Sequence, residues 1–289
     1  MARPLRIEFP GAVYHVSSRR AAGAPAFADD DDRQVLLDLL AQAMQRFDAQ
    51  VLAYCLLPDH YDLVLYTRQA NLSRLMRHVN GVYTQYHNRR HGGSGALFQG
   101  RFRAVLVDRE ALLLDLCRYV ELSPQRLGLV SGAQDWPWSS YRAHAGLEEA
   151  PPWLDVDGLH GYVLSRPATT AAEHRRAAER YARLVASEPE LDLWAGRLRQ
   201  QIFLGDAAFA EKMRAWAARA SGNGARRAAR PKAWADWLRE SESREEALYR
   251  AHTEGGLSMT TLAGALDLSV SRVSRLIAGY ERAQAEATA

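Results

Sequence analysis

The sequence predicts an α+β fold, in which helices pack on an antiparallel sheet and an all-α C-terminal region with a helix-turn-helix follows. Two observations lead to this prediction. The first 122 residues switch between two-residue and 3.6-residue hydrophobic periods in the order β-α-β-β-α-β-α. Strands and helices in that order are typical of a sheet with one or more helical layers. The last segment, from about Ala233, has a helical period.

The first three elements are a strand, a helix and a strand pair. A strand over Ala12–Ser18 follows the turn formed by Pro10 and Gly11. The acidic run Asp29–Asp32 suits the start of a helix, because carboxylates there interact favourably with the helix dipole. Helical spacing then appears at Val35, Leu36, Leu39, Leu40, Ala43, Met44 and Phe47. The runs Val51–Leu57 and His60–Thr67 predict two paired strands, or one strand interrupted at Pro58 and Asp59.

A second helix, a strand and a third helix complete this region. Asn71 is a suitable N-cap for a helix that ends at Gly92 and Gly93. The apolar stripe of this helix is Leu72, Leu75, Met76, Val79, Val82, Tyr83 and Tyr86. The strand-like run Phe98–Val107 places Arg101 and Arg103 on one face. The third helix, Ala111–Leu122, is expected to end there because Pro124 disfavours helical geometry at Ser123.

Breaks in composition divide the chain into three predicted parts, 1–147, 148–232 and 233–289. The run Trp136–Tyr141 closes the first part, and Pro151-Pro152 marks a joint. Residues 173–220 are mostly helical, and the stretch Ser221–Gly224 is followed by a basic linker with Arg226, Arg227 and Arg230.

Composition restricts the class of protein. Hydrophobic residues make up 47% of the chain and charged residues 25%, which is typical of a soluble globular protein. All 37 basic residues except Lys212 and Lys232 are arginines. Arginine suits phosphate binding, although a GC-rich genome produces the same bias. Cys55 and Cys117 lie in apolar runs and are expected to be buried free thiols. The sequence shows neither a membrane-spanning run nor a signal-like segment, so the expected location is cytoplasmic.

The stretch Leu57–Leu65 carries the most informative pattern in the chain. Side chains on a strand alternate between faces, so His60 and Asp62 share one face. The opposite face carries Tyr61, Leu63 and Leu65. An imidazole and a carboxylate side by side can hold a divalent cation that polarises a phosphodiester. Taken alone, the same spacing is also typical of a half-exposed strand without a metal.

Six ordered blocks of sequence identify a family resemblance. They are YHVSSRR (14–20), AYCLLPDHYDLVLYT (53–67), NGVYTQYHNRRHG (80–92), LFQGRFRAVLVD (97–108), CRYVELSPQRLGLV (117–130) and WPWSSYRAH (136–144). Together they resemble the REP-associated tyrosine transposases, which carry an IS200-like transposase domain and belong to the single-tyrosine HUH superfamily. The resemblance spans roughly residues 1–147.

The resemblance implies a ferredoxin-like nuclease domain that nicks and rejoins DNA through a 5′-phosphotyrosine intermediate. The DNA would be single-stranded or hairpin, such as repetitive extragenic palindromes. The implied nucleophile is Tyr119, which shares a polar helix stripe with Asp115 and Ser123. The implied cofactor is Mg²⁺ or Mn²⁺, with His60, Asp62 and Ser123 at the ligand positions.

The sequence departs from the family pattern at two of those positions. Asp62 replaces a histidine, and Ser123 replaces an asparagine. The alternative function is therefore a catalytically impaired transposase relic that acts as a DNA-binding or regulatory protein. Tyr83 and Tyr86 are competing nucleophiles, but they lie on an apolar stripe and are expected to be core residues.

Basic residues are the expected DNA contacts. Within the first part, the candidates for holding the DNA backbone are Arg89, Arg90, Arg101 and Arg103. His87 and His91 stand one helical turn apart, which is also a metal-ligand spacing. Because they lie in a basic cluster, phosphate contact is the favoured interpretation. The protein is expected to be a monomer or a homodimer without a membrane partner.

The stretch Leu257–Tyr280 has the pattern of a helix-turn-helix, with a plain αα-hairpin as the alternative. Asp267 falls at the turn, where left-handed geometry is expected, and Ser269 is expected to cap the second helix. The inward residues are expected to be Leu262, Ala263, Leu266, Val270, Val273 and Ile277. The residues expected to face a DNA major groove are Ser271, Arg272, Ser274 and Arg275.

Overall fold

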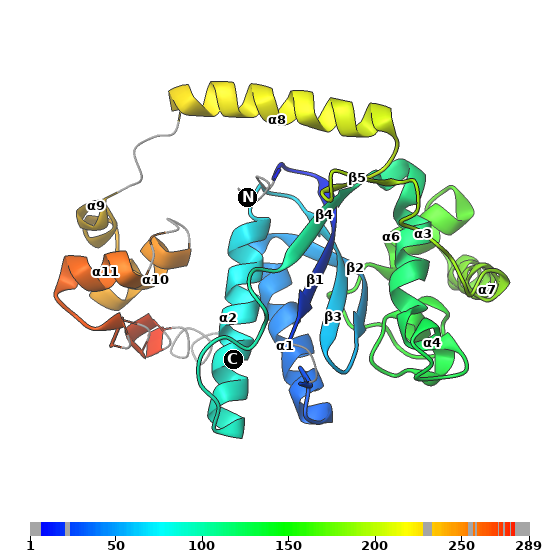
Figure 1. Cartoon of the computed structure of the whole chain (residues 1–289), viewed down its shortest axis with the longest axis horizontal. Helices are drawn as coiled ribbons and strands as arrows, with labels where there is room; N and C mark the ends of the chain where they lie inside the picture. Colours follow the sequence, from blue (N-terminus) through cyan, green and yellow to red (C-terminus); the bar gives the residue numbers. More distant parts are fainter. Residues whose placement is uncertain are drawn as a thin grey trace. The chain divides into compact units, whose positions relative to one another are not determined.

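The computed structural model describes residues 7–20, 24–227, 233–253, 257, 259–270, 272–273, 275–277 and 279–280. In chain order the elements are β1 (Ala12–Arg19), α1 (Asp30–Phe47), β2 (Ala49–Leu56), β3 (His60–Thr67), α2 (Leu72–His91), β4 (Arg103–Val107), α3 (Arg109–Glu121), α4 (Ser123–Arg126), the 3₁₀ helix η1 (Ala133–Asp135), α5 (Tyr141–His144), α6 (Val156–Leu164), α7 (Ala171–Ser187), β5 (Leu198–Arg199), β6 (Phe203–Leu204), α8 (Ala207–Arg227), α9 (Trp234–Arg239), α10 (Arg244–Thr253) and α11 (Met259–Leu266) (Figure 1). Within these residues, every helix is too short or too polar to cross a membrane.

The chain divides into two compact units, Met1–Ala215 and Trp216–Ala289. Residues 148–215 belong to the first unit because their apolar side chains enter the same cores as the strands do, Leu159, Tyr181 and Phe203 among them. The division therefore differs from the boundaries predicted after residues 147 and 232.

A six-stranded sheet with the order β2-β3-β1-β4-β6-β5 organises the first unit. The four strands β2, β3, β1 and β4 pair antiparallel, as predicted. The sheet as a whole is mixed, because β6 pairs with β4 in parallel and β5 returns antiparallel to β6. The short strands β5 and β6 follow α7 in the chain, and their two-residue pairing has no clear pattern in the sequence.

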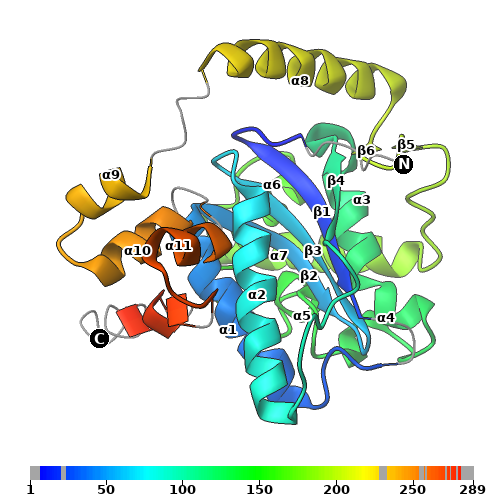
Figure 2. The same cartoon turned by 60° about the vertical axis from the view of Figure 1, so that its left-hand side comes forward.

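Helices cover both faces of this sheet and create two cores (Figures 1 and 2). Helices α1 and α2 pack on the face that carries Tyr61, Leu63 and Leu65. Helices α3 and α6 pack on the face that carries Val64 and the buried free thiol Cys55, and α7 packs on α6. The alternation predicted for His60–Leu65 is therefore confirmed.

Two predicted helix starts have different outcomes. Helix α1 begins after Asp29, whose side chain accepts a hydrogen bond from the Asp32 amide, so the acidic cap is confirmed. Asn71 occupies the N-cap position of α2 but its side chain makes no capping bond. Its Nδ2 instead donates to the Phe47 carbonyl oxygen at 2.7 Å, which joins the start of α2 to the end of α1.

The predicted strand Phe98–Val107 and the end of the third helix need correction. Strand β4 is shorter than predicted and begins only at Arg103, so Arg101 precedes it. Helix α3 ends at Glu121, but the chain stays helical at Ser123 and forms the short helix α4. Pro124 does not prevent this because proline is tolerated in the first turn of a helix, where its missing N–H is not needed.

The second unit packs its helices around Trp237, Leu248, Leu262, Val273 and Ile277. Asp267 has a φ of 53°, and the Ser269 hydroxyl accepts from the Arg272 amide at 3.2 Å, so the turn and the cap are as predicted. Val270 is not packed inward as predicted but is 44% exposed, because it lies in the first turn after the cap and at the edge of the core.

The outward residues of this motif are described only in part. Arg272 and Arg275 are exposed, whereas Ser271 and Ser274 lie outside the described residues. A DNA-binding helix-turn-helix therefore stays a prediction.

Candidate active site

The candidate site lies on the α3 face of the sheet, where three strands bring polar residues together. Antiparallel pairing sets Arg19 opposite His60 and Ser17 opposite Asp62. The same Ser17 faces Arg103 on the other neighbouring strand. A cavity of about 450 Å³ opens over these strands. Its lining includes His15, Ser17, Arg19, His60, Asp62, Gln99, Arg101, Arg103, Tyr119, Ser123, Arg126 and Trp194.

Asp62 is a buried carboxylate between two imidazoles. Its Oδ1 lies 3.1 Å from His15 Nε2, and its Oδ2 lies 3.5 Å from His60 Nε2. Burial alone would raise the pKa of Asp62, but close contact with these two rings outweighs burial and holds the pKa well below its usual range. The group is therefore an anion at neutral pH.

His15 lies beside Asp62 in this cluster, and its Nε2 contacts the carboxylate at 3.1 Å. Its Nδ1 is buried with no hydrogen-bond partner among the described residues. Buried polar atoms are usually satisfied, so this ring nitrogen remains for a further contact.

His60 is held by its neighbours in one orientation. Its Nδ1 lies 2.5 Å from an oxygen of Asp59, in the turn between β2 and β3. Its Nε2 lies 3.2 Å from Arg19 Nη2. Burial lowers the pKa of His60, but the contacts with Asp62 and Asp59 outweigh burial, so the pKa is raised overall. A carboxylate on the far nitrogen is the arrangement that orients metal-binding histidines.

Tyr119 reaches the cavity from the last turn of α3. Its ring meets Trp194 edge-on at 5.5 Å, and the Arg126 guanidinium lies 3.8 Å from the ring centroid. The structure thus brings Tyr119, His60 and Asp62 to one cavity. The competing Tyr83 is fully buried in the other core and donates to the Ala26 carbonyl oxygen, as expected of a core residue.

Arg126 and Ser123 surround the backbone of Tyr119. Arg126 donates to the Tyr119 carbonyl oxygen at 2.7 Å and to the Ser123 hydroxyl at 2.9 Å. Ser123 in turn donates to the same carbonyl oxygen at 3.1 Å. Burial lowers the pKa of Arg126, although an arginine remains charged in proteins. A fixed positive charge therefore stands beside the phenol.

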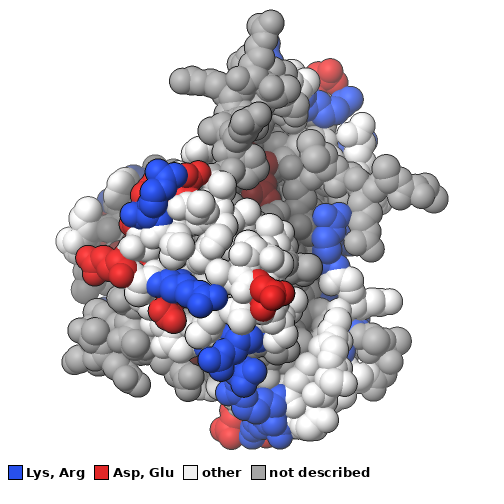
Figure 3. Space-filling model, turned by 90° about the vertical axis from the view of Figure 1, so that its left-hand side faces the viewer, with Lys and Arg blue, Asp and Glu red and all other residues white. Residues whose placement is uncertain are grey.

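The predicted DNA-contact arginines have different surroundings. Arg101 and Arg103 line the cavity, and Arg103 also donates to Gln201 at 3.1 Å. Arg89 is exposed near the end of α2. Arg90 instead forms ion pairs with three carboxylates, those of Asp29, Asp31 and Asp32. Basic and acidic side chains are also intermingled on the face shown in Figure 3.

Several side chains of the cavity were not predicted from the sequence, among them His15, Arg126 and Trp194. His15 had a usable signal, because His15, Ser17 and Arg19 alternate along the predicted first strand and share its polar face. Arg126 lies two helical turns after Tyr119. Because the third helix was predicted to end at Leu122, the sequence did not indicate that these two side chains lie on the same side. Trp194 follows α7 and lies outside every motif, so no local pattern pointed to it.

Comparison with known protein families finds a match for part of the chain. Residues 11–123 match the model of the family described as "Transposase IS200 like". The match covers fewer than half of the 289 residues, so this segment is similar to an IS200-like transposase domain. The matched segment contains His15, His60, Asp62 and Tyr119 and ends at Ser123, whereas Arg126 and Trp194 come after it.

Comparisons with solved structures and with curated proteins add no family assignment. A solved structure of a REP-associated tyrosine transposase bound to a REP hairpin is similar with 16% sequence identity and a TM-score of 0.46, covering 52% of this chain and 89% of that one. No curated protein matches the chain.

Proposed function

We propose that the protein binds single-stranded or hairpin DNA and nicks and rejoins it through a covalent bond to Tyr119. The observation that supports this most strongly is the single cavity lined by Tyr119, Arg126 and the cluster His15, His60 and Asp62. The similarity of residues 11–123 to an IS200-like transposase domain supports the same class of reaction.

The residues of the cavity fit a divalent cation such as Mg²⁺ or Mn²⁺. A buried carboxylate with neighbouring imidazoles is a suitable donor set, and adjacent ligands of an octahedral ion lie about 3 Å apart. The separations of 3.1 and 3.5 Å between Asp62 and the two histidines are close to this spacing. We assign the ligand roles to His60, Asp62 and His15. The predicted ligand Ser123 lines the same cavity, but its hydroxyl is shared by Arg126 and the Tyr119 carbonyl.

The bound cation would polarise the phosphodiester and offset its negative charge. Tyr119 Oη attacks phosphorus and loses its proton, while the bond from phosphorus to the 3′ oxygen breaks. The products are a 5′-phosphotyrosine and a free 3′-hydroxyl. Arg126 stabilises the phenolate as it forms, because a phenol with a pKa near 10 is otherwise a weak nucleophile at neutral pH. Attack of a 3′-hydroxyl on the phosphotyrosine reverses the step and joins the strands.

Arginines around the cavity are placed to hold the DNA backbone. Arg19, Arg101 and Arg103 share its lining and offer forked donors to phosphate oxygens. The proposed surface also includes the exposed Arg89 but excludes Arg90, whose charge is neutralised by aspartates. In the second unit, exposed Arg272 and Arg275 are proposed to contact duplex DNA, as are Ser271 and Ser274.

A covalent-adduct assay tests the proposed function. The protein is mixed with labelled hairpin oligonucleotides and Mg²⁺ or Mn²⁺, and denaturing gels are read for a labelled protein band. We expect an adduct that EDTA abolishes, because the cation is required for chemistry. Hairpin binding without an adduct across many hairpins would instead support the transposase relic, which the replaced residues at 62 and 123 favour. Neither binding nor an adduct would contradict both functions.

His15→Ala tests the ligand that the structure adds to the site. We expect the rate of adduct formation to fall about 10–100-fold, a loss typical when one partner of a metal centre is removed. The matched control is His78→Ala on α2, where His78 packs on Phe47 away from the cavity at 5.6 Å between ring centres. If His15→Ala cuts as fast as His78→Ala, His15 has no role at the metal.

A further inference from the structure

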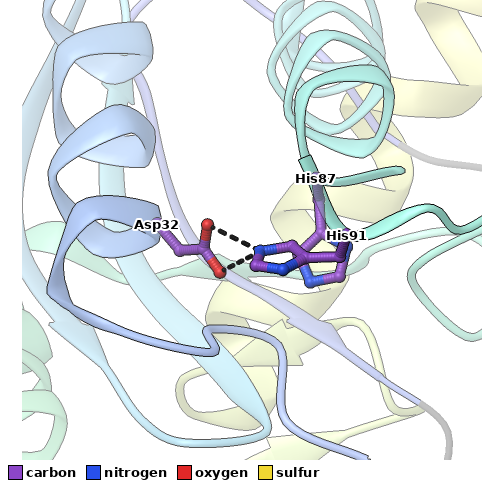
Figure 4. Close-up of side chains that lie close together, drawn as sticks. All are labelled: Asp32, His87 and His91. Atoms are coloured by element: carbon purple, nitrogen blue, oxygen red, sulfur yellow. Dashed lines mark hydrogen bonds and ion pairs between the residues drawn. The ribbon is translucent and has the colours of Figure 1, made fainter. Parts of the chain in front are cut away.

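A second cluster of metal-ligating side chains lies where the start of α1 meets the end of α2. Figure 4 shows His87 and His91 extending from α2 toward Asp32 on α1. One ligand atom from each of the three residues lies within 4.8 Å of the other two. His91 Nε2 is 3.1 and 3.0 Å from the two oxygens of Asp32. These helices cover the face of the sheet opposite the candidate active site, so the two clusters are separate.

Burial and an unused nitrogen distinguish this cluster from a surface ion pair. The Asp32 side chain is fully buried, and His87 is 5% exposed. The Nδ1 atom of His87 is buried with no hydrogen-bond partner among the described residues. Buried polar atoms without partners are rare, and an unseen ion is one of their recognised causes.

The charges around the cluster favour a cation. Asp29, Asp31 and Asp32 place three carboxylates around the single guanidinium of Arg90, so acidic groups outnumber guanidiniums there, and Asp32 also contacts His91. A divalent ion would balance the local charge and give the buried Nδ1 of His87 a partner.

We propose that Asp32, His87 and His91 bind one transition-metal ion of the Zn²⁺ class. Two imidazoles and one carboxylate are a donor set that zinc uses, with a fourth position left for water. The ion would join the first turn of α1 to the last turn of α2. The segment that follows α2 carries Gln99 and Arg101 into the active-site cavity, so the ion would anchor the origin of that segment.

Zinc titration tests this site without depending on the proposed function. The double variant His60→Ala/Asp62→Ala removes donors from the active-site cavity, and Zn²⁺ alone is titrated against a chromogenic chelator. We expect one equivalent to bind and to raise the melting temperature. Adding His91→Gln should lower the zinc affinity at least about tenfold, because mutation of even an outer-sphere partner typically lowers metal affinity by about that factor.

Controls distinguish the loss of a zinc ligand from a general loss of structure. His91 has a partly exposed side chain, so His91→Gln is expected to fold, which circular dichroism checks. His252→Gln, in the second unit, is the matched control and should leave zinc affinity unchanged. In the chain with native His60 and Asp62, His91→Gln should remove one equivalent of bound zinc. Absence of zinc binding in the double variant, or equal affinity of the His91→Gln and His252→Gln chains, would overturn the proposal.

Discussion

The Tyr119→Phe protein is expected to form no covalent adduct with a hairpin oligonucleotide, a loss of at least about a thousandfold. The reason is that removal of a nucleophile eliminates the covalent route and leaves only weak background reactions. The substitution deletes one oxygen and keeps the ring between Trp194 and Arg126. Hairpin affinity should therefore be unchanged, which a filter-binding assay measures beside the adduct gel.

Tyr86→Phe provides the matched control for this experiment. Tyr86 lies on α2 and packs against the core on the opposite face of the sheet, 6.3 Å from the Tyr83 ring. The control should form the adduct at the native level. An adduct that persists in Tyr119→Phe and disappears in Tyr86→Phe would move the nucleophile to α2 and refute the proposed site.

A buried carboxylate supports the helix that carries Tyr119. Glu121 ends α3 and is fully buried. It accepts hydrogen bonds from His144 Nδ1 and Tyr181 Oη, both at 2.6 Å, and from the Ser140 hydroxyl. Ser140 and His144 belong to α5 and its N-cap, and Tyr181 belongs to α7, so one side chain ties two later segments to the end of α3.

Glu121→Ala is expected to lower the free energy of unfolding by about 3–5 kcal/mol, because it leaves several buried donors without an acceptor. Urea denaturation measures this change. The control is Glu211→Ala, which removes a 74%-exposed carboxylate paired at 2.9 Å with Arg214, itself 46% exposed. That variant should lose at most about 1 kcal/mol, as exposed ion pairs do. Equal losses in the two variants would show that the Glu121 network adds little stability.

Local sequence patterns correctly predicted which side chains share a face of a strand and where a turn occurs. Two-residue alternation assigned His60 and Asp62 to one face and Leu63 to the other, and the tolerance of aspartate for left-handed geometry located the turn at Asp267. Features that depend on how separate elements meet were not predictable. The sequence predicted that Arg90 contacts the DNA backbone, but α1 lies beside α2 and its start supplies the aspartates that bind Arg90.

The same distinction holds for the candidate site: local motifs predicted some of its residues, and contacts between strands were not predictable. Tyr119, His60 and Asp62 follow from motifs, and alternation along the first strand assigns His15 to its polar face. The position of His15 beside Asp62, however, depends on the register between β1 and β3. A register cannot be derived from either strand alone, because a one-residue slip would move every side chain to the other face.

The strand β6 has a consequence for any shortened form of the protein. Its segment occupies the outer side of β4, where Leu106 and Asp108 donate backbone hydrogen bonds to the carbonyl oxygens of Ile202 and Leu204, both at 2.8 Å. A chain cut after residue 147 would leave that row of amides and carbonyls bare. Bare strand edges recruit other strands, so such a fragment would tend to self-associate and precipitate. In the longer chain, residues 202–204 cover this edge of β4.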